Sequence, residues 1–204
     1  MVPRIRHVLF DFDQVLAHYR HERRIAYLAD ATGRTHARVR EVLFTSGLET
    51  VYDSGLLDTA TYLARLGGGL GASIDEERWI ASRVAGSDAA RDVLVHVEAL
   101  APEITLGILT NNGALMADAI PRILGPGCCR FDGRILSSGA LGVRKPDPAV
   151  FRRALDRLGW QAGDTLFVDD SFANVQAART LGIHADTVKD GRSLRRVLKR
   201  HGLA

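Results

Sequence analysis

The sequence predicts an α/β fold, a doubly wound parallel sheet with an inserted α-helical subdomain. Three apolar runs have the composition of buried parallel strands: HVLF at 7–10, ITLGILT at 104–110 and TLFVDD at 165–170. Amphipathic helical patterns follow the later runs, as in a sheet built from strand–helix–strand units. The first two runs are separated by about three times the roughly 30 residues that such a unit needs, so an insertion is expected between them.

Two weaker strand candidates, RILSS at 134–138 and HADTV at 184–188, complete the predicted sheet. Two amphipathic helices are expected between the later strands. In DPAVFRRALDRLG, Asp147 is a suitable N-cap and Pro148 fits the first helical position. In SFANVQAARTLG, the predicted N-cap is Ser171. The alternation of strands and helices indicates helices on both faces of the sheet.

The predicted insertion covers residues 16–87 and contains several short helical patterns without strand-like alternation. We therefore expect an α/β core formed by residues 1–15 and 88–204, with a helical cap formed by the segment between them. The glycine-rich run GGGLG at 67–71 lacks the Lys-Ser/Thr pair of a phosphate-binding loop. It is expected to be a flexible connector.

Composition excludes several classes of protein. The chain has 204 residues, of which 46% are hydrophobic and 25% charged, and its net charge is +3. No basic stripe alternates with aromatic residues, so no nucleic-acid partner is expected. No apolar run approaches the length of a membrane span, and no cleavable leader is recognisable, so no membrane partner is expected. The adjacent Cys128 and Cys129 are unsuited to a structural disulfide, which favours a cytoplasmic location. The oligomeric state is left open.

Polar side chains follow the predicted strands at their carboxyl ends, the edge where open α/β sheets bind ligands. They are Asp11, Asp13, Thr110, Asn111, Lys145, Asp169 and Asp170. Any one of these residues alone is commonly a turn, cap or surface residue. Four carboxylates in one crevice repel one another by roughly 4 kcal/mol per pair at 4 Å, with an effective dielectric of about 20. A hard divalent cation relieves this repulsion, and a site of few carboxylates plus substrate phosphate suits Mg²⁺.

The sequence motifs resemble those of the haloacid dehalogenase superfamily over nearly the whole chain. The family's four motifs, in order, are similar to VLFDFDQV, LGILTN, RKPDPAVF and LFVDDS. The insertion is similar to the family's small α-helical cap, and the sheet is similar to its Rossmann-like core. This resemblance implies a Mg²⁺-dependent phosphatase that hydrolyses a small phosphomonoester, such as a sugar phosphate, through an aspartyl-phosphate. The partner it implies is a small phosphorylated metabolite.

The resemblance also implies a role for each catalytic position. Asp11 is implied to be the nucleophile, and Asp13 the general acid that protonates the leaving oxygen and then the base that activates water. Thr110 and the Asn111 amide are implied to bind the transferring phosphoryl group. Lys145 is implied to neutralise charge on that group and on Asp11.

The metal ligands follow from the same resemblance. Asp11, the backbone carbonyl of Asp13 and the carboxylate of Asp170 are implied to coordinate Mg²⁺. Asp169 is implied to act through water or to orient Lys145.

Two alternatives stay open. Hydrolytic 2-haloacid dehalogenases resemble this chain but lack an acid at the position of Asp13, since halide leaves without a proton. A non-catalytic phosphate-binding scaffold would not require the full set of polar residues. A further departure is Gln14, where the family usually has glycine, so the loop after Asp13 is expected to differ and the choice of substrate is in doubt.

Several polar residues at the start of the insertion are weaker candidates for substrate contact. They are His18, Tyr19, Arg20, His21, Arg23 and Arg24. Trp79 and Trp160 are expected to be packing residues instead.

Overall fold

The structure is a computed structural model that describes residues 5–204, so the first four residues of the expected core lie outside it. A parallel sheet of five strands has the order β5–β4–β1–β6–β7. Its strands are β1 (His7–Phe10), β4 (Thr105–Thr110), β5 (Ile135–Ser137), β6 (Thr165–Asp169) and β7 (His184–Thr187). The α/β prediction and all five predicted strands are therefore confirmed.

The central position of β1 determines which chain segments meet at the carboxyl edge of the sheet. Phe10, the last residue of β1, pairs with Ile108 of β4 on one side and with Val168 of β6 on the other. The residues that follow these three strands are consequently neighbours. This is the edge at which the sequence analysis placed the polar residues.

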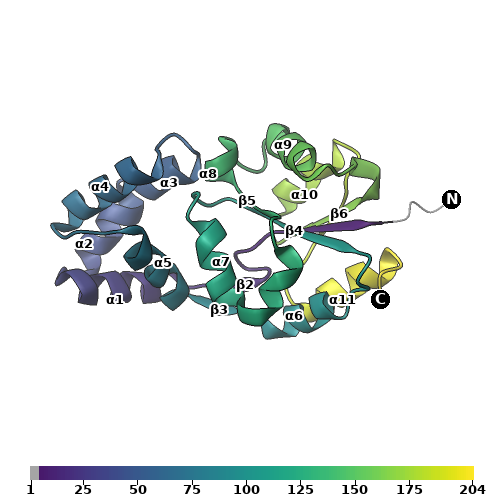
Figure 1. Cartoon of the computed structure of the whole chain (residues 1–204), viewed down its shortest axis with the longest axis horizontal. Coiled ribbons are helices and arrows are strands. Elements are labelled where there is room, and N and C mark those ends of the chain that lie inside the picture. The colour runs from purple at the N-terminus through teal and green to yellow at the C-terminus, as the bar shows by residue number, and fades with distance from the viewer. Residues whose placement is uncertain (1–4) are drawn as a thin grey trace.

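Helices cover both faces of the sheet (Figure 1). On one face lie α6 (Arg91–Glu98), α7 (Met116–Leu124) and α11 (Gly191–Arg200), and on the other lie α9 (Pro148–Leu158) and α10 (Phe172–Arg179). The alternation of side chains along the central strand explains this arrangement. Val8 and Phe10 belong to the first hydrophobic cluster, and Leu9 belongs to the second. The sheet is therefore doubly wound, as predicted.

Shorter elements connect these layers. They are η2 (Gly125–Phe131), α8 (Ser138–Leu141) and η3 (Ala162–Asp164). At the start of α9, Asp147 accepts a hydrogen bond from Ala149 N and Pro148 occupies the first turn, as predicted. None of the helices within residues 5–204 is long and apolar enough to cross a membrane.

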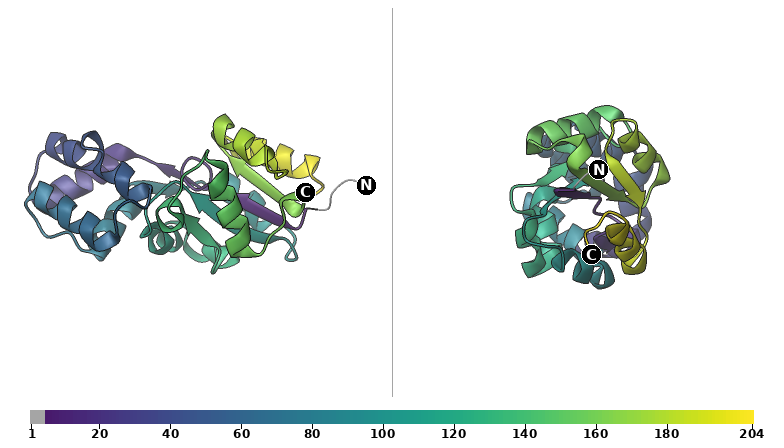
Figure 2. Two further views of the ribbon diagram at one scale, coloured as in Figure 1. Left: turned by 90° about the horizontal axis from the view of Figure 1, so that it is seen from above. Right: turned by 90° about the vertical axis from the view of Figure 1, so that its right-hand side faces the viewer.

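A group of helices between β1 and β4 forms a separate lobe at the end of the molecule opposite the C-terminus (Figure 2). We call this lobe, residues 16–87, the helical insert. Its helices are α1 (His21–Thr32), α2 (His36–Arg40), η1 (Glu41–Thr45), α3 (Leu48–Asp53), α4 (Thr59–Leu70) and α5 (Glu76–Ala85). Buried residues of the insert continue the hydrophobic cluster of the sheet.

Two short strands that the sequence analysis missed lie at the base of the insert. β2 (Ala17–Tyr19) pairs antiparallel with β3 (Ser87–Ala89). Strands of three residues are too short to show a period of two, which is why no alternation was visible. The expected insert boundary at 15/16 lies just before β2, and the one at 87/88 lies within β3.

The prediction that GGGLG at 67–71 is a flexible connector is wrong. Gly67 to Leu70 form the last turn of α4, and Gly71 ends the helix with a φ of +63°. The glycines permit close packing, because a Cβ at Gly69 would lie 2.7 Å from Val42 Cγ1. Packing of α4 against η1 therefore overrides the low helix propensity of glycine.

Candidate active site

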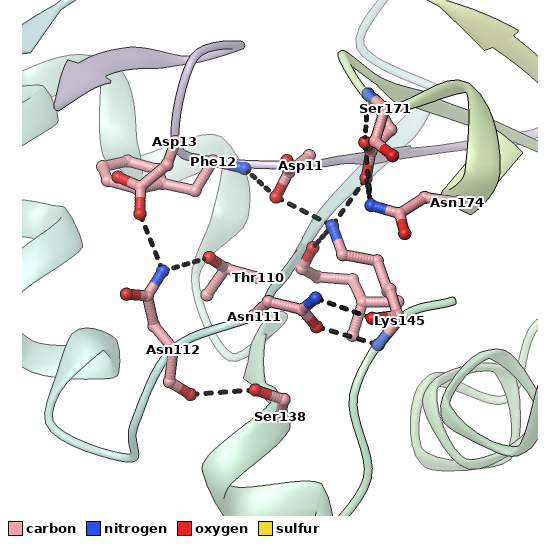
Figure 3. A network of polar contacts seen from close by, with 12 residues as sticks. Asp11, Phe12, Asp13, Thr110, Asn111, Asn112, Ser138, Lys145, Ser171 and Asn174 are labelled. Atoms are coloured by element: carbon pink, nitrogen blue, oxygen red, sulfur yellow. Dashed lines mark hydrogen bonds and ion pairs between the residues drawn. The ribbon is translucent and has the colours of Figure 1, made fainter. Parts of the chain in front are cut away.

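A buried lysine lies at the carboxyl edge of the sheet, between the ends of β1 and β6 (Figure 3). The Nζ atom of Lys145 is 2.8 Å from Asp11 Oδ1 and 2.7 Å from Asp169 Oδ2. It also donates a hydrogen bond of 2.8 Å to the carbonyl oxygen of Leu109. Because an ammonium group has three donors, these three acceptors satisfy Lys145 completely. The two acids and the lysine thus form one buried charge cluster.

The side chain of Asn111 fixes the loop that carries Lys145. Its Nδ2 atom donates to the Lys145 carbonyl oxygen, and its Oδ1 atom accepts from the Lys145 backbone N–H, both at 2.8 Å. Figure 3 shows this paired contact. The amide side chain of Asn111 is therefore occupied by the protein, and only its backbone is free to meet a ligand.

Asp169 is fully buried and its carboxylate is saturated with donors. Besides Lys145, Ser171 N donates to Oδ1 at 2.8 Å and Asn174 Nδ2 contacts both oxygens at 3.0 Å. Ser171 is the N-cap residue of α10, as predicted, but its side chain makes no capping hydrogen bond. Asp169 instead accepts from the backbone N–H at that position. Asn174 was not identified from the sequence.

Three carboxylates come close enough to share a cation. Oxygen atoms of Asp11, Asp169 and Asp170 lie within 4.8 Å of one another. Burial raises the pKa of Asp11 to about 7, and repulsion from Asp169 adds to this rise, although the positive charge of Lys145 acts in the opposite direction. Burial, followed by repulsion from Asp169, also raises the pKa of Asp170. It is therefore unfavourable for Asp11 and Asp170 to be ionised at the same time without a cation. Carboxylate oxygens in this arrangement fit a hard divalent cation such as Mg²⁺.

Asp13 lies outside this group of three and contacts the helical insert. Both of its carboxylate oxygens are 3.0 Å from Arg83 Nη2, and Oδ2 also accepts from Asn112 Nδ2 at 2.9 Å. Asn112 Nδ2 is 2.7 Å from the hydroxyl oxygen of Thr110, which links Asp13 to the end of β4 (Figure 3). The structure therefore brings Asp13 and Thr110 together through a residue to which the sequence analysis gave no role.

Gln14 adopts the backbone conformation that favours glycine, with a φ of +66°. Its N–H bonds to the Ala17 carbonyl oxygen at 2.7 Å, and its side chain donates to the Tyr19 carbonyl oxygen at 3.1 Å. These two contacts hold the strained residue, at a cost of about 1–2 kcal/mol. Although the family usually has glycine at this position, Gln14 still forms a tight turn with left-handed backbone conformation in the loop after Asp13.

A cavity of about 420 Å³ separates the sheet edge from the helical insert. On the side of the sheet it is lined by Asp11, Asp13, Asn111, Asn112 and Asp170. This size is typical of a small-molecule site. The lining is largely polar, which suits a charged ligand.

The family model for haloacid dehalogenase-like hydrolases matches residues 5–182. The chain belongs to this family. Solved structures of similar fold include a predicted HAD-like family hydrolase from Porphyromonas gingivalis, with 26% identity and a TM-score of 0.74. The similarity covers 96% of this chain and 97% of that one.

Two further structures of similar fold are a magnesium and phosphate complex and a dehalogenase. A HAD family enzyme from Bacteroides thetaiotaomicron, solved with magnesium and inorganic phosphate, has 20% identity and a TM-score of 0.74, covering 95% of this chain and 98% of that one. L-2-haloacid dehalogenase from Xanthobacter autotrophicus has 24% identity and a TM-score of 0.60, covering 98% of this chain and 84% of that one. At these identities the likeness concerns the fold alone.

A curated relative supports the hydrolase family from sequence. Phosphoglycolate phosphatase from Rhodospirillum rubrum is 36% identical over 101 residues, which is 49% of this chain and 41% of that protein. In six curated relatives of this chain, the matched segment spans at most 41% of the relative's own length.

In this haloacid dehalogenase-like chain, the arginines near the start of the insert form ion pairs with acidic residues. Arg20 and Arg23 form exposed ion pairs with Asp88, at 3.2 and 2.7 Å. Arg24 is fully buried and forms a bidentate pair with Glu49. Of the six weaker candidates for substrate contact, three line the cavity: Tyr19, His21 and Arg24. The other three, His18, Arg20 and Arg23, are absent from its lining. Trp79 and Trp160 are buried, as expected.

Proposed function

We propose that this chain is a Mg²⁺-dependent phosphatase that hydrolyses a small phosphomonoester through an aspartyl-phosphate formed on Asp11. One observation carries the proposal. A buried lysine pairs with Asp11 at 2.8 Å at the edge of a 420 Å³ polar cavity, while a second acid, Asp13, lies two residues further along the chain. A carboxylate nucleophile with a second acid close by suits phosphoryl transfer through a covalent intermediate, because the second acid can protonate the leaving oxygen.

Asp11 and Asp170 are the proposed carboxylate ligands of Mg²⁺, with the backbone carbonyl of Asp13 as a third. Asp169 contributes to the same acidic group, but donors from Lys145, Ser171 and Asn174 already occupy its oxygens. We therefore assign Asp169 to orienting Lys145. When bound, Mg²⁺ supplies charge neutralisation to the phosphoryl oxygens and to the acids around it.

In the proposed first step, a carboxylate oxygen of Asp11 attacks phosphorus, and the bond from phosphorus to the leaving oxygen breaks. Asp13 donates its proton to that oxygen. In the second step Asp13 takes a proton from water, the hydroxide attacks phosphorus and the bond to Asp11 breaks. Lys145 stabilises the charge on Asp11 and on the phosphoryl group throughout.

The phosphoryl group is proposed to bind the Thr110 hydroxyl and the backbone N–H of Asn111. Lys145 is proposed to exchange one of its three protein contacts for a phosphoryl oxygen. The position of Asn112, within 3.0 Å of both Thr110 and Asp13, supports an additional role in holding these two side chains. We assign it as a positioning residue.

The helical insert is proposed to act as a cap that excludes water and selects the leaving group. A cavity bounded by the insert and the sheet edge supports this role, and the phosphoglycolate phosphatase relative supports a small phosphorylated metabolite as substrate. Free cysteines at positions 128 and 129 support a cytoplasmic location.

Hydrolytic dehalogenation is the second candidate, favoured by the fold of the Xanthobacter enzyme. Asp13 and the acidic group argue against it, because halide departure needs neither a proton nor a metal. A non-catalytic scaffold is the third candidate, and the complete set of polar residues argues against it.

One experiment separates the three candidates. Purified protein is assayed for p-nitrophenyl phosphate hydrolysis with Mg²⁺ or with EDTA, and for chloride release from 2-chloropropionate. The phosphatase proposal predicts phosphate release only with Mg²⁺ and no chloride release. Chloride release without metal indicates a dehalogenase, and no turnover in either assay indicates a scaffold.

A further inference from the structure

Asp53, at the end of α3, is a buried acid that the proposed mechanism does not use. Only 9% of its surface is exposed, and it lines the same cavity as Asp11 and Asp170. Its Oδ1 atom is closed off from solvent and has no hydrogen-bond partner among residues 5–204. A buried carboxyl group with an unpaired oxygen is costly and therefore calls for an explanation.

The other charged residues of the insert that face the cavity have partners within the protein. Arg24 pairs with Glu49, and the hydroxyl of Tyr62 also donates to Glu49. Arg83 pairs with Asp13. Burial, followed by repulsion from Glu49, raises the pKa of Asp53 to about 7, and the weaker attraction of Arg144, Arg83 and Arg24 does not offset this rise. Among residues 5–204, Asp53 is thus the acid of this wall whose side chain has neither a hydrogen-bond nor an ion-pair partner.

The position of Asp53 is fixed relative to the sheet edge. The Ser138 hydroxyl, at the start of α8, donates to the Asp53 carbonyl oxygen at 2.5 Å. The neighbouring Tyr52 accepts from Leu115 N at 3.1 Å, and its ring lies so close to Gly113 that a Cβ there would be 2.0 Å from Tyr52 Cε1. These contacts hold the backbone of Asp53 at a fixed position beside the cavity. A group that determines specificity must be positioned in this way.

We propose that Asp53 determines substrate specificity by accepting a hydrogen bond from a hydroxyl or ammonium group on the leaving group, through Oδ2, the carboxylate oxygen that is not closed off from solvent. The substrate class is then a phosphomonoester of a polyol, sugar or amino alcohol. A substrate carrying a carboxylate at this position is rejected by repulsion and by the loss of the hydrogen bond. This inference rests on the proposed phosphatase function and adds the chemistry of the leaving group.

The test compares the parent with Asp53→Asn, which keeps the shape of the side chain and removes the charge. Values of kcat/KM are measured with Mg²⁺ on phenyl phosphate, glycerol 1-phosphate, phosphoethanolamine and phosphoglycolate. The ratio of variant to parent is taken for each substrate, because this cancels differences in leaving-group reactivity. Asp30→Asn, an exposed acid on α1 of the same insert, is the matched control.

We expect Asp53→Asn to lower kcat/KM about tenfold or more on glycerol 1-phosphate or on phosphoethanolamine, because a charged hydrogen bond is lost. The substrate affected shows whether the donor is a hydroxyl or an ammonium group. Activity on phenyl phosphate, which has no such donor, should stay within twofold, and activity on phosphoglycolate should not fall. The control should match the parent on all four substrates.

Two results would overturn the inference. An equal fall on all four substrates would show that Asp53 is only structural, and unchanged values on both donor substrates would show that it does not contact the leaving group. A parent that fails to hydrolyse any of the four with Mg²⁺ would overturn the proposed function, and this inference with it. Melting curves of the variant exclude misfolding as the cause of a loss.

Discussion

Arg83 of the helical insert holds both carboxylate oxygens of Asp13, each at 3.0 Å from its Nη2 atom. The guanidinium group also lies 3.9 Å from the centre of the Tyr19 ring, and Nε contacts Met116 Sδ at 3.2 Å. One buried arginine thus joins α5, the base of the insert and the loop after β1. The proposed general acid is therefore in contact with the insert as well as with the sheet.

Replacing this arginine should loosen the insert. Arg83→Leu leaves Asp13 without its ion-pair partner. We expect the free energy of unfolding to fall by about 2–3 kcal/mol, somewhat below the loss for a fully buried pair because Asp13 is 25% exposed. The matched control is Arg122→Leu, which breaks an exposed pair between Glu77 of α5 and α7 and should cost less than about 1 kcal/mol. Urea unfolding measures both. Equal losses in the two variants would contradict a special role for the Arg83 contact.

The buried lysine should be more critical to stability than any surface cation. Lys145→Met removes the positive charge between Asp11 and Asp169 and leaves two buried acids without a compensating charge. We expect a loss of about 3–5 kcal/mol at neutral pH. Lys199→Met, an exposed lysine on α11, should change the free energy of unfolding by less than about 0.5 kcal/mol. A loss below about 1 kcal/mol for Lys145→Met would show that the acids do not depend on it.

If the acids bind Mg²⁺, the melting temperatures of the parent and of Asp170→Asn should respond differently to the metal. Burial and repulsion raise the pKa of Asp170, so its charge opposes folding near neutral pH when no cation is present. Asp170→Asn should therefore melt higher than the parent in EDTA, with a gain of about 1 kcal/mol corresponding to roughly 2–4 °C. With Mg²⁺ at a hundredfold excess over Kd, the parent should gain about 2.7 kcal/mol and become the more stable of the two. If Mg²⁺ leaves the parent unchanged, these acids do not bind it.

The buried Asp53 makes a separate prediction about pH. Because its pKa rises from 3.8 to about 7 on folding, the folded protein binds this proton more tightly, and stability is lost as pH rises through about 4 to 7. Asp53→Asn removes that loss. Relative to the parent, the variant should gain about 2–3 kcal/mol between pH 5 and pH 8 in EDTA. Asp11 titrates in both proteins, so its contribution cancels. Parallel stability curves would show that Asp53 is not a destabilising buried acid.

The sequence was sufficient for the parts of the site that lie at strand ends. Apolar runs ending in Asp11 and Asp169 predicted both the strands and the acids beyond them, because parallel strands place their carboxyl ends at one edge. Lys145 could be included because a motif in a known order carries it. The predictions for Asp11 and Asp169 depend on local pattern and topology, whereas that for Lys145 depends on the family resemblance.

The contacts from the insert could not be predicted in the same way. Arg83 lies in an ordinary amphipathic helix, 70 residues from Asp13, and only the packing of the insert brings the two together. Asp53 has no local signal either, since a single acid near a helix end is usually exposed. The ribbon of β2 and β3 was missed because three residues show no period. Tertiary packing, which a single sequence does not display, decides all three.

The most direct test of the account is to look for the phosphoryl group on Asp11. The parent protein is mixed with Mg²⁺ and p-nitrophenyl phosphate, quenched in acid during turnover, digested and examined by mass spectrometry. We expect the peptide containing Asp11 to carry one added phosphoryl group, which hydroxylamine removes, and we expect none in Asp11→Asn, which should also lose turnover by at least about a thousandfold. Undiminished phosphate release by Asp11→Asn, or a phosphoryl group found on a different residue, would contradict the account.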